Sequence, residues 1–198
     1  MKRAIYIFAS LSLMFLSFGS PSHAIPPARI PATGQTSCYD SEGTTIPCAG
    51  TGQDGETQIG VAWPVPRFTD NGNGTVTDNL TGLIWLKNAD CFGPQVWTTA
   101  LSSAGSLASG QCGLSDGSTV GQWRLPNVNE LESLIDERHP NPMLPPGHPF
   151  TADRFVVFWS SSAITGNAWA WMVFLDRDGT TFADIRSTCS VWPVRAGQ

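Results

Sequence analysis

The residues best suited to chemistry are two histidines, a run of serines and two pairs of acids. His139 and His148 are the only histidines after residue 24, and both stand in a proline-rich stretch. Ser160, Ser161 and Ser162 lack the Gly-x-Ser-x-Gly setting of a nucleophile elbow. A Ser/His enzyme needs a base within hydrogen-bond reach of its nucleophile. We therefore expect serines that bond to the backbone and histidines on a surface loop.

The acid pairs are Glu130 with Glu132 and Asp176 with Asp178. They match glycoside hydrolysis by residue type, because glycosidases place two carboxyl groups across the scissile bond. Glu130 is better explained as a helix cap, and the two aspartates as turn formers before Gly179. No cysteine and histidine spacing is typical of a zinc site. The sequence favours a protein that is not an enzyme and holds no cofactor.

A calcium site is the one metal alternative, at an Asn-Gly-Asn-Gly turn. Oxygen-bearing side chains gather there at Asp70, Asn71, Asn73 and Asp78. Glycines occupy positions at which a calcium loop needs oxygen ligands, and the late bidentate acid is missing. Asn-Gly is also a strong hairpin signal, because both residues tolerate positive φ. We expect a plain hairpin, with calcium as the lesser alternative.

Aromatic residues supply the candidate binding surface. The chain has eight tryptophans against two tyrosines. Trp169 and Trp171 share one face of a predicted strand, since side chains alternate along a strand. That face either packs in the core, the more common case, or forms an exposed platform for a sugar or a protein. Together with Asp176 and Asp178, these tryptophans are the candidate binding residues.

The stretch from residue 123 to 135 is the element that organises the chain. Asn127 is a predicted N-cap, with Glu130 reaching back to it as in a capping box. Pro126 stiffens the entry into the helix. Arg124 stands between two large apolar side chains, so we expect it to be buried and held by backbone carbonyls or an acid. Trp123 is expected in the core, which makes all five residues structural.

The other predicted elements define an α+β domain. A helix is expected over about 97–108, a hairpin over 67–78 and an apolar, central strand over 83–86. An edge strand is expected over 61–65, and further antiparallel strands over 155–159, 168–175, 180–185 and 191–195. Two helices and many short strands are typical of that class.

Five cysteines point to an oxidising compartment. The close pairs predict the disulfides Cys38–Cys48 and Cys91–Cys112, although other pairings stay open. Cys189 is left over. Cys189 is predicted to be a buried thiol, and the alternative is an intermolecular or reactive cysteine.

The first 24 residues resemble a secretory leader. A basic start precedes an apolar run, and Ser22-His23-Ala24 suits signal peptidase. Removing Lys2 and Arg3 leaves nine basic and sixteen acidic residues, a net charge of −7. That sign disfavours nucleic acid and polyanionic partners. We expect an exported, periplasmic or extracellular protein without a membrane span, with a lead over 25–66 that carries a disulfide hairpin and one domain over 67–198.

Four separated motifs carry a resemblance to a known bacterial family. They are the Phe-Thr-Asp-Asn-Gly-Asn-Gly-Thr hairpin with its Thr-Gly-Leu-Ile-Trp continuation (68–85), Trp-Arg-Leu-Pro-Asn (123–127), Phe-Trp-Ser-Ser-Ser (158–162) and Trp-Pro-Val-Arg (192–195). In type and order they resemble domain of unknown function 1566, also called the collagen-like adhesin C-terminal domain. The Arg-Leu-Pro turn is also similar to formylglycine-generating-enzyme-like proteins, whose catalytic cysteine pair is not matched here because only Cys189 lies in that region.

The resemblance implies a C-type-lectin-like fold, with two helices packed on a loop-rich antiparallel sheet, and carries over no catalytic residue. The leading hypothesis is an exported, non-catalytic binding or adhesion domain whose ligand is a glycan or a cell-surface protein. One alternative is an enzyme that acts on glycans or surface proteins. The other is a structural subunit of an envelope assembly that self-associates through Cys189 or the lead.

Overall fold

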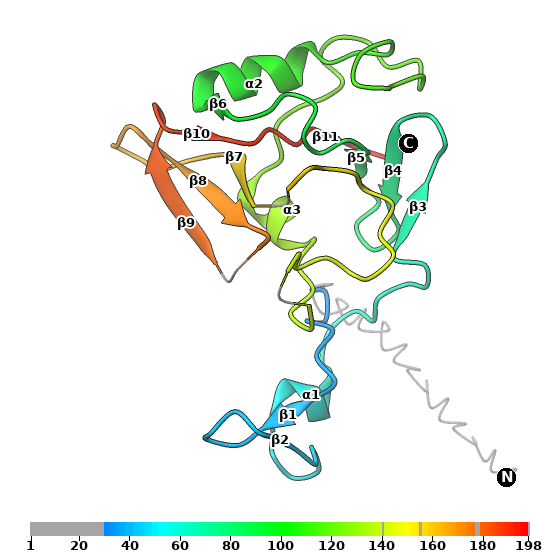
Figure 1. Ribbon diagram of the computed structural model, residues 1–198, viewed down its shortest axis with the longest axis vertical. Coiled ribbons are helices and arrows are strands. Elements are labelled where there is room, and N and C mark those ends of the chain that lie inside the picture. Colours follow the sequence, from blue (N-terminus) through cyan, green and yellow to red (C-terminus); the bar gives the residue numbers. More distant parts are fainter. Residues whose placement is uncertain (1–29, 140, 155, 177–178, 198) are drawn as a thin grey trace, which may run out of the picture.

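The computed structural model describes residues 30–139, 141–154, 156–176 and 179–197. The predicted leader and Asp178 lie outside these ranges. The described chain is an α+β structure whose strand pairs in the sheets are all antiparallel, as predicted (Figure 1). Among its helices, none is both long and apolar enough to cross a membrane.

A four-stranded sheet holds the predicted hairpin and the predicted central strand. Its order is β11 (Val194–Arg195), β5 (Ile84–Leu86), β4 (Thr75–Asp78) and β3 (Phe68–Asp70). The Asn71 amide donates to the Thr75 carbonyl at 3.0 Å, which closes the hairpin. The apolar strand β5 lies between β4 and β11, so its prediction as a central strand is confirmed.

A three-stranded sheet forms the other half of the domain. It consists of β7 (Val157–Ala163), β8 (Trp169–Phe174) and β9 (Thr180–Asp184) in that order. The helix α3 (Val128–Glu132) contacts β7 and β8, and α2 (Trp97–Ser106) contacts β7. These contacts build the core between helices and sheet (Figure 1).

The short strands β6 (Gln95–Val96) and β10 (Thr188–Cys189) pair beside α2. The Trp97 amide, at the start of α2, donates to the Ile185 carbonyl at 3.0 Å. The disulfide Cys91–Cys112 joins the chain before α2 to the chain after it, as predicted. The helix is therefore tied to the sheet at its start and to its own flanking loops.

Tryptophans dominate the core, because each buries a large apolar surface. Trp85, Trp123, Trp159 and Trp192 are all at most 1% exposed, and the predicted core position of Trp123 is confirmed. The Trp192 indole donates to the Leu86 carbonyl at 2.8 Å, and the Trp159 indole donates to the Gln95 carbonyl at 2.9 Å. The burial of these rings joins both sheets into one core.

The lead carries the predicted disulfide hairpin and an unpredicted helical turn. Cys38–Cys48 closes β1 (Cys38–Tyr39) and β2 (Thr45–Ile46), and α1 (Asp54–Thr57) packs beside them. Figure 1 shows this unit projecting from the rest of the molecule. The edge strand predicted over 61–65 is wrong, since Val61 makes a single bridge to Pro31 and Val65 is 98% exposed.

Candidate functional site

Three aromatic side chains form an exposed cluster on the three-stranded sheet. Trp169 is 41% exposed, Phe182 is 42% exposed and Trp171 is half-buried beside Phe182. The Trp169 and Phe182 rings stack at 4.9 Å with an interplanar angle of 14°. Trp171 meets the Phe182 ring edge-on at 5.6 Å. We call Trp169, Trp171 and Phe182 the aromatic cluster.

Strand alternation and the position of α3 explain why these rings are exposed. Trp169, Trp171 and Val173 lie on one face of β8, and Phe182 lies directly opposite Trp171 on β9. Val173 is fully buried together with Phe158 and Leu131 of α3. The short helix therefore covers only one end of this face. The aromatic cluster occupies the other end, which is exposed to solvent. Large exposed apolar groups next to one another are typical of an interaction site.

An open pocket of about 810 Å³ lies next to the aromatic cluster. It is lined by α3 residues such as Glu132, by Thr180 at the start of β9, and by Pro31 and Trp63 of the lead. Thr180 lies two residues from Phe182 on the same face of β9, and its hydroxyl donates to the Glu132 carboxylate at 2.5 Å. Polar groups therefore stand beside exposed aromatic rings, a combination that is typical of ligand sites.

The structure does not bring Asp176 to the aromatic cluster. Asp176 follows the end of β8 opposite to Trp169, and it borders a separate pocket of about 430 Å³ with Asp153 and Arg154. Asp178 lies outside the described residues. Phe182 was not predicted as a binding residue. Thr180 and Phe182 are two positions apart and so lie on one face of the strand that follows the turn from β8. That spacing was a signal that Phe182 lies beside Trp171.

The stretch around Arg124 forms the predicted helix cap, with one correction. The capping box is present, since Asn127 accepts from the Glu130 amide at 2.9 Å and Glu130 accepts from the Asn127 amide at 2.8 Å. Arg124 holds the same carboxylate through two bonds of 2.6 and 2.7 Å. The prediction of a buried Arg124 is wrong, because its side chain is 48% exposed. Trp123 and Leu125 point inward, and alternation turns Arg124 outward.

Two forces act on the Glu130 carboxyl group. Partial burial favours its neutral form, but the hydrogen bonds from Arg124 and from the Asn127 backbone outweigh burial and hold the pKa of Glu130 below its ordinary 4.5. A carboxylate committed to a cap and an ion pair is poorly placed for acid catalysis. Glu132, the other member of this pair, is bonded to Thr180.

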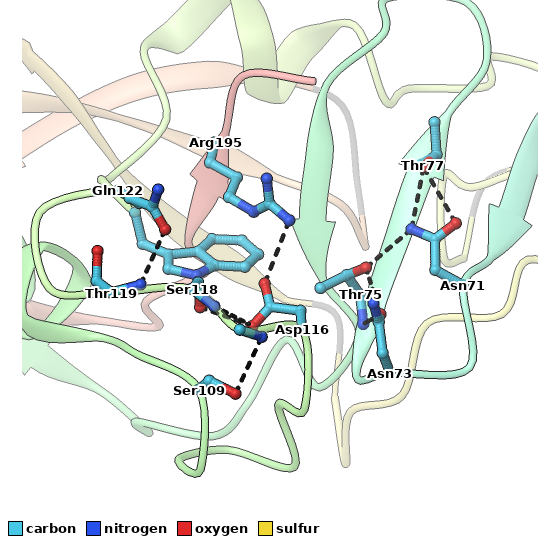
Figure 2. A network of polar contacts seen from close by, with 12 residues as sticks. Asn71, Asn73, Thr75, Thr77, Ser109, Asp116, Ser118, Thr119, Gln122 and Arg195 are labelled. Atoms are coloured by element: carbon cyan, nitrogen blue, oxygen red, sulfur yellow. Dashed lines mark hydrogen bonds and ion pairs between the residues drawn. The ribbon is translucent and has the colours of Figure 1, made fainter. Parts of the chain in front are cut away.

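A buried polar network that the sequence did not predict holds the loop after α2 (Figure 2). The fully buried Asp116 carboxylate lies 3.2 Å from the Arg195 guanidinium and accepts from the Ser118 hydroxyl at 2.7 Å. Ser118 in turn accepts from the Trp123 indole at 3.0 Å. Burial acts to raise the pKa of Asp116, but the bonds from Ser118 and the charge of Arg195 hold it below its ordinary value.

The oxygens of the calcium-like turn are committed to bonds within the hairpin and to Lys87, which follows β5. Asp70 pairs with Lys87 at 2.7 Å, and the Thr75 hydroxyl donates to Asn73 at 2.7 Å (Figure 2). Asp78 is fully buried in a bidentate pair with Arg67, with bonds of 2.8 and 2.9 Å. Over the described ranges, no three histidines, cysteines or acids are grouped to hold a metal ion.

The candidate nucleophiles and bases are dispersed. The Ser160 hydroxyl donates to the Trp171 carbonyl at 2.7 Å, as expected of a serine that bonds to backbone. His139 stands 3.7 Å from Asp136, and burial lowers the pKa of the half-buried His148. Cys189 is 5% exposed beside Met172, and burial raises the pKa of its thiol to about 11. The predicted buried thiol is confirmed.

The fold and this surface define a disulfide-stabilised antiparallel α+β module that presents an exposed aromatic cluster beside an open pocket. The chain belongs to the Lcl C-terminal domain family, whose model matches residues 74–195. That match covers both sheets and α2 and α3, apart from β3, and leaves the lead outside. No curated protein matches the chain.

Proposed function

We propose that the chain is an exported, non-catalytic binding domain of the adhesin type, and that its aromatic cluster binds a neutral glycan. The observation that carries the proposal is the stacked pair of Trp169 and Phe182, each about two-fifths exposed on a rigid sheet. The apolar C–H face of a pyranose ring packs on an indole ring, and Trp is enriched among residues that dominate binding energy.

The polar groups at the two ends of the aromatic cluster support a sugar ligand. Thr180 and Glu132 lie at one end, and Asp184 lies opposite Trp169 at the other. Hydroxyl groups donate hydrogen bonds to sugar hydroxyls and accept from them, and carboxylates accept from them. The net charge of −7 expected after leader removal argues for a neutral glycan over an anionic one.

Export and architecture complete the proposal. A leader over residues 1–24 and two disulfides support a periplasmic or extracellular site. The lead over 25–66 and the single domain over 67–198 are our proposed boundaries. We further propose that the domain is of the 1566 type with a C-type-lectin-like architecture, which the helices packed against antiparallel sheets support.

A binding screen run beside a hydrolase screen tests this function. Immobilised neutral glycans and cell-surface proteins are probed with the mature chain and with Trp169→Ala. Tyr39→Ala is the matched control, because Tyr39 is a 47% exposed aromatic residue in the separate hairpin of the lead. We expect glycan binding that Trp169→Ala reduces at least tenfold and Tyr39→Ala leaves unchanged. Turnover of a glycan without stable binding would favour the alternative that the chain is an enzyme. Binding to a protein alone would refute the proposal that the ligand is a glycan.

A further inference from the structure

The outer edge of β9 is an open strand edge. The outer edge of β7 is covered, since the Trp159 amide donates to the Ser190 carbonyl and the Ser190 amide donates to the Val157 carbonyl, each at 3.1 Å. β9 is the last strand of its sheet, and Figure 1 shows it at the margin of the molecule. In the described chain no strand pairs with that side of β9.

The register shows which backbone groups face outward from β9. The Phe174 amide donates to Gly179 at 3.1 Å, and the Ile185 amide donates to Ala168 at 3.0 Å. Hydrogen-bonded and non-bonded pairs alternate along an antiparallel ladder. Thr181 and Ala183 therefore bond to β8, while Thr180 and Phe182 direct their N–H and C=O groups away from it. Asp184 does the same, but its carbonyl already accepts from the Ser187 amide at 2.8 Å.

The residues of this edge lack the usual protection against pairing. Proteins guard exposed edges with proline, lysine, bulges or very short strands. The five residues Thr180–Asp184 contain neither proline nor lysine, and their pairing with β8 is unbroken. By contrast, the edge strand β3 has only three residues.

We propose that β9 pairs antiparallel with β9 of a second copy of this chain, around a twofold axis at Phe182. In this register Phe182 faces Phe182 of the other copy, and both exchange their outward N–H and C=O bonds. Thr180 faces Asp184, a neutral side chain against a carboxylate, at the two positions that the axis relates. The strand is self-complementary, because no like charges oppose each other and Asp184 is already paired with Arg186 at 3.1 Å.

The pairing joins two three-stranded sheets into one of six strands. It also places the two aromatic clusters side by side, so that the dimer presents twice the aromatic surface on one face. A twofold interface is the commonest way in which identical chains associate. The pairing does not depend on the ligand. An experiment can therefore refute the pairing without refuting glycan binding, and the reverse.

Charge-swap variants at the twofold axis test the pairing. Analytical ultracentrifugation of the mature chain should give a dimer, whereas Phe182→Lys and Phe182→Glu alone should each give monomers through like-charge repulsion. An equimolar mixture of the two variants should restore the dimer, because lysine then faces glutamate. Val120→Lys, at a position 69% exposed and away from β9, should remain dimeric. A wild-type monomer, or a mixture that stays monomeric, overturns the proposal.

Amide hydrogen exchange tests the same contact in the wild-type chain and needs no variant. The Thr181 and Ala183 amides are bonded within one copy and should be protected at every concentration. The Phe182 amide faces outward, so its protection should rise with protein concentration. Exchange at Phe182 that stays fast at the highest concentration contradicts the pairing, as does a dimer in which Phe182 remains unprotected.

Discussion

At the scale of single residues, the Glu130 carboxylate has two roles at once, because it belongs to the capping box and also holds Arg124. Glu130 accepts from the Asn127 backbone and from both terminal nitrogens of Arg124. Arg124 itself is fixed on the sheet by two backbone bonds to Val194, of 3.0 and 2.9 Å. The start of α3 is thereby locked to the end of the chain.

Truncating Glu130 should cost more stability than truncating Arg124. Glu130→Ala loses the reciprocal half of the capping box together with the ion pair, for an expected loss of about 1–2 kcal/mol. Arg124→Ala loses a half-exposed ion pair, which solvent screens, for an expected loss below about 1 kcal/mol. Urea unfolding of both variants checks this order, and a larger loss for Arg124→Ala would contradict it.

Acid should remove the contribution of Glu130 in a defined window. Its pKa in the folded chain lies below the ordinary 4.5, so its contribution is complete above that pH and is lost as the pH falls through the folded pKa. Glu130→Gln cannot ionise. The difference in unfolding free energy between wild type and Glu130→Gln should therefore shrink below pH 4.5, and a constant difference would refute the argument.

Cys189 should be inert in the folded protein. Its thiol is 5% exposed and its pKa is raised to about 11 by burial, so the reactive thiolate is scarce at neutral pH. A thiol reagent should label Cys189 slowly in the native chain and rapidly after unfolding. Fast native labelling, or a dimer that a reductant dissolves, would instead favour an assembly linked through Cys189.

At the scale of elements, α2 and the loop after it are held from several sides. Cys91–Cys112 ties the flanks of the helix together, and the pair of Asp116 with Arg195 ties the loop to β11. Arg195 also lies over the Trp123 ring at 5.3 Å. The long loop therefore forms part of the core structure, although its composition is polar.

Removing the Cys91–Cys112 disulfide should destabilise the main domain. Replacing both cysteines by serine frees a loop with a sequence separation of 21, and the expected loss is about 3 kcal/mol. The Cys38→Ser, Cys48→Ser double variant is the control, because that disulfide closes only the hairpin of the lead. Thermal unfolding followed by core tryptophan fluorescence should respond to the first pair alone. An equal response to both pairs would show that the lead and the domain unfold together.

Local signals were sufficient for much of the fold. The Asn127 cap, the Asn-Gly hairpin and the apolar strand β5 depend on neighbouring residues, and the structure confirms each of them. The exposure of Trp169 was not predictable in this way, because it depends on how far α3 reaches over the sheet. The same is true of Asp116 and Arg195, which lie 79 positions apart and meet only in the folded chain.

At the scale of the whole molecule, the aromatic cluster, the open pocket and the free edge of β9 share one sheet. Thr180 lines the pocket, Phe182 belongs to the cluster, and both direct backbone groups outward from the edge. The core tryptophans lie in the domain interior at no more than 1% exposure. The proposed binding and the proposed self-association thus both use a surface that folding leaves uncovered.

The indole N–H signals of the eight tryptophans test the central claim most directly. In a nitrogen–proton correlation spectrum, titration with a glycan from the binding screen should shift Trp169 and Trp171. The signals of Trp85, Trp123, Trp159 and Trp192 should stay in place, because these rings are buried. Saturable shifts confined to Trp169 and Trp171 are the predicted result. A bound glycan that leaves both signals unmoved would contradict the account.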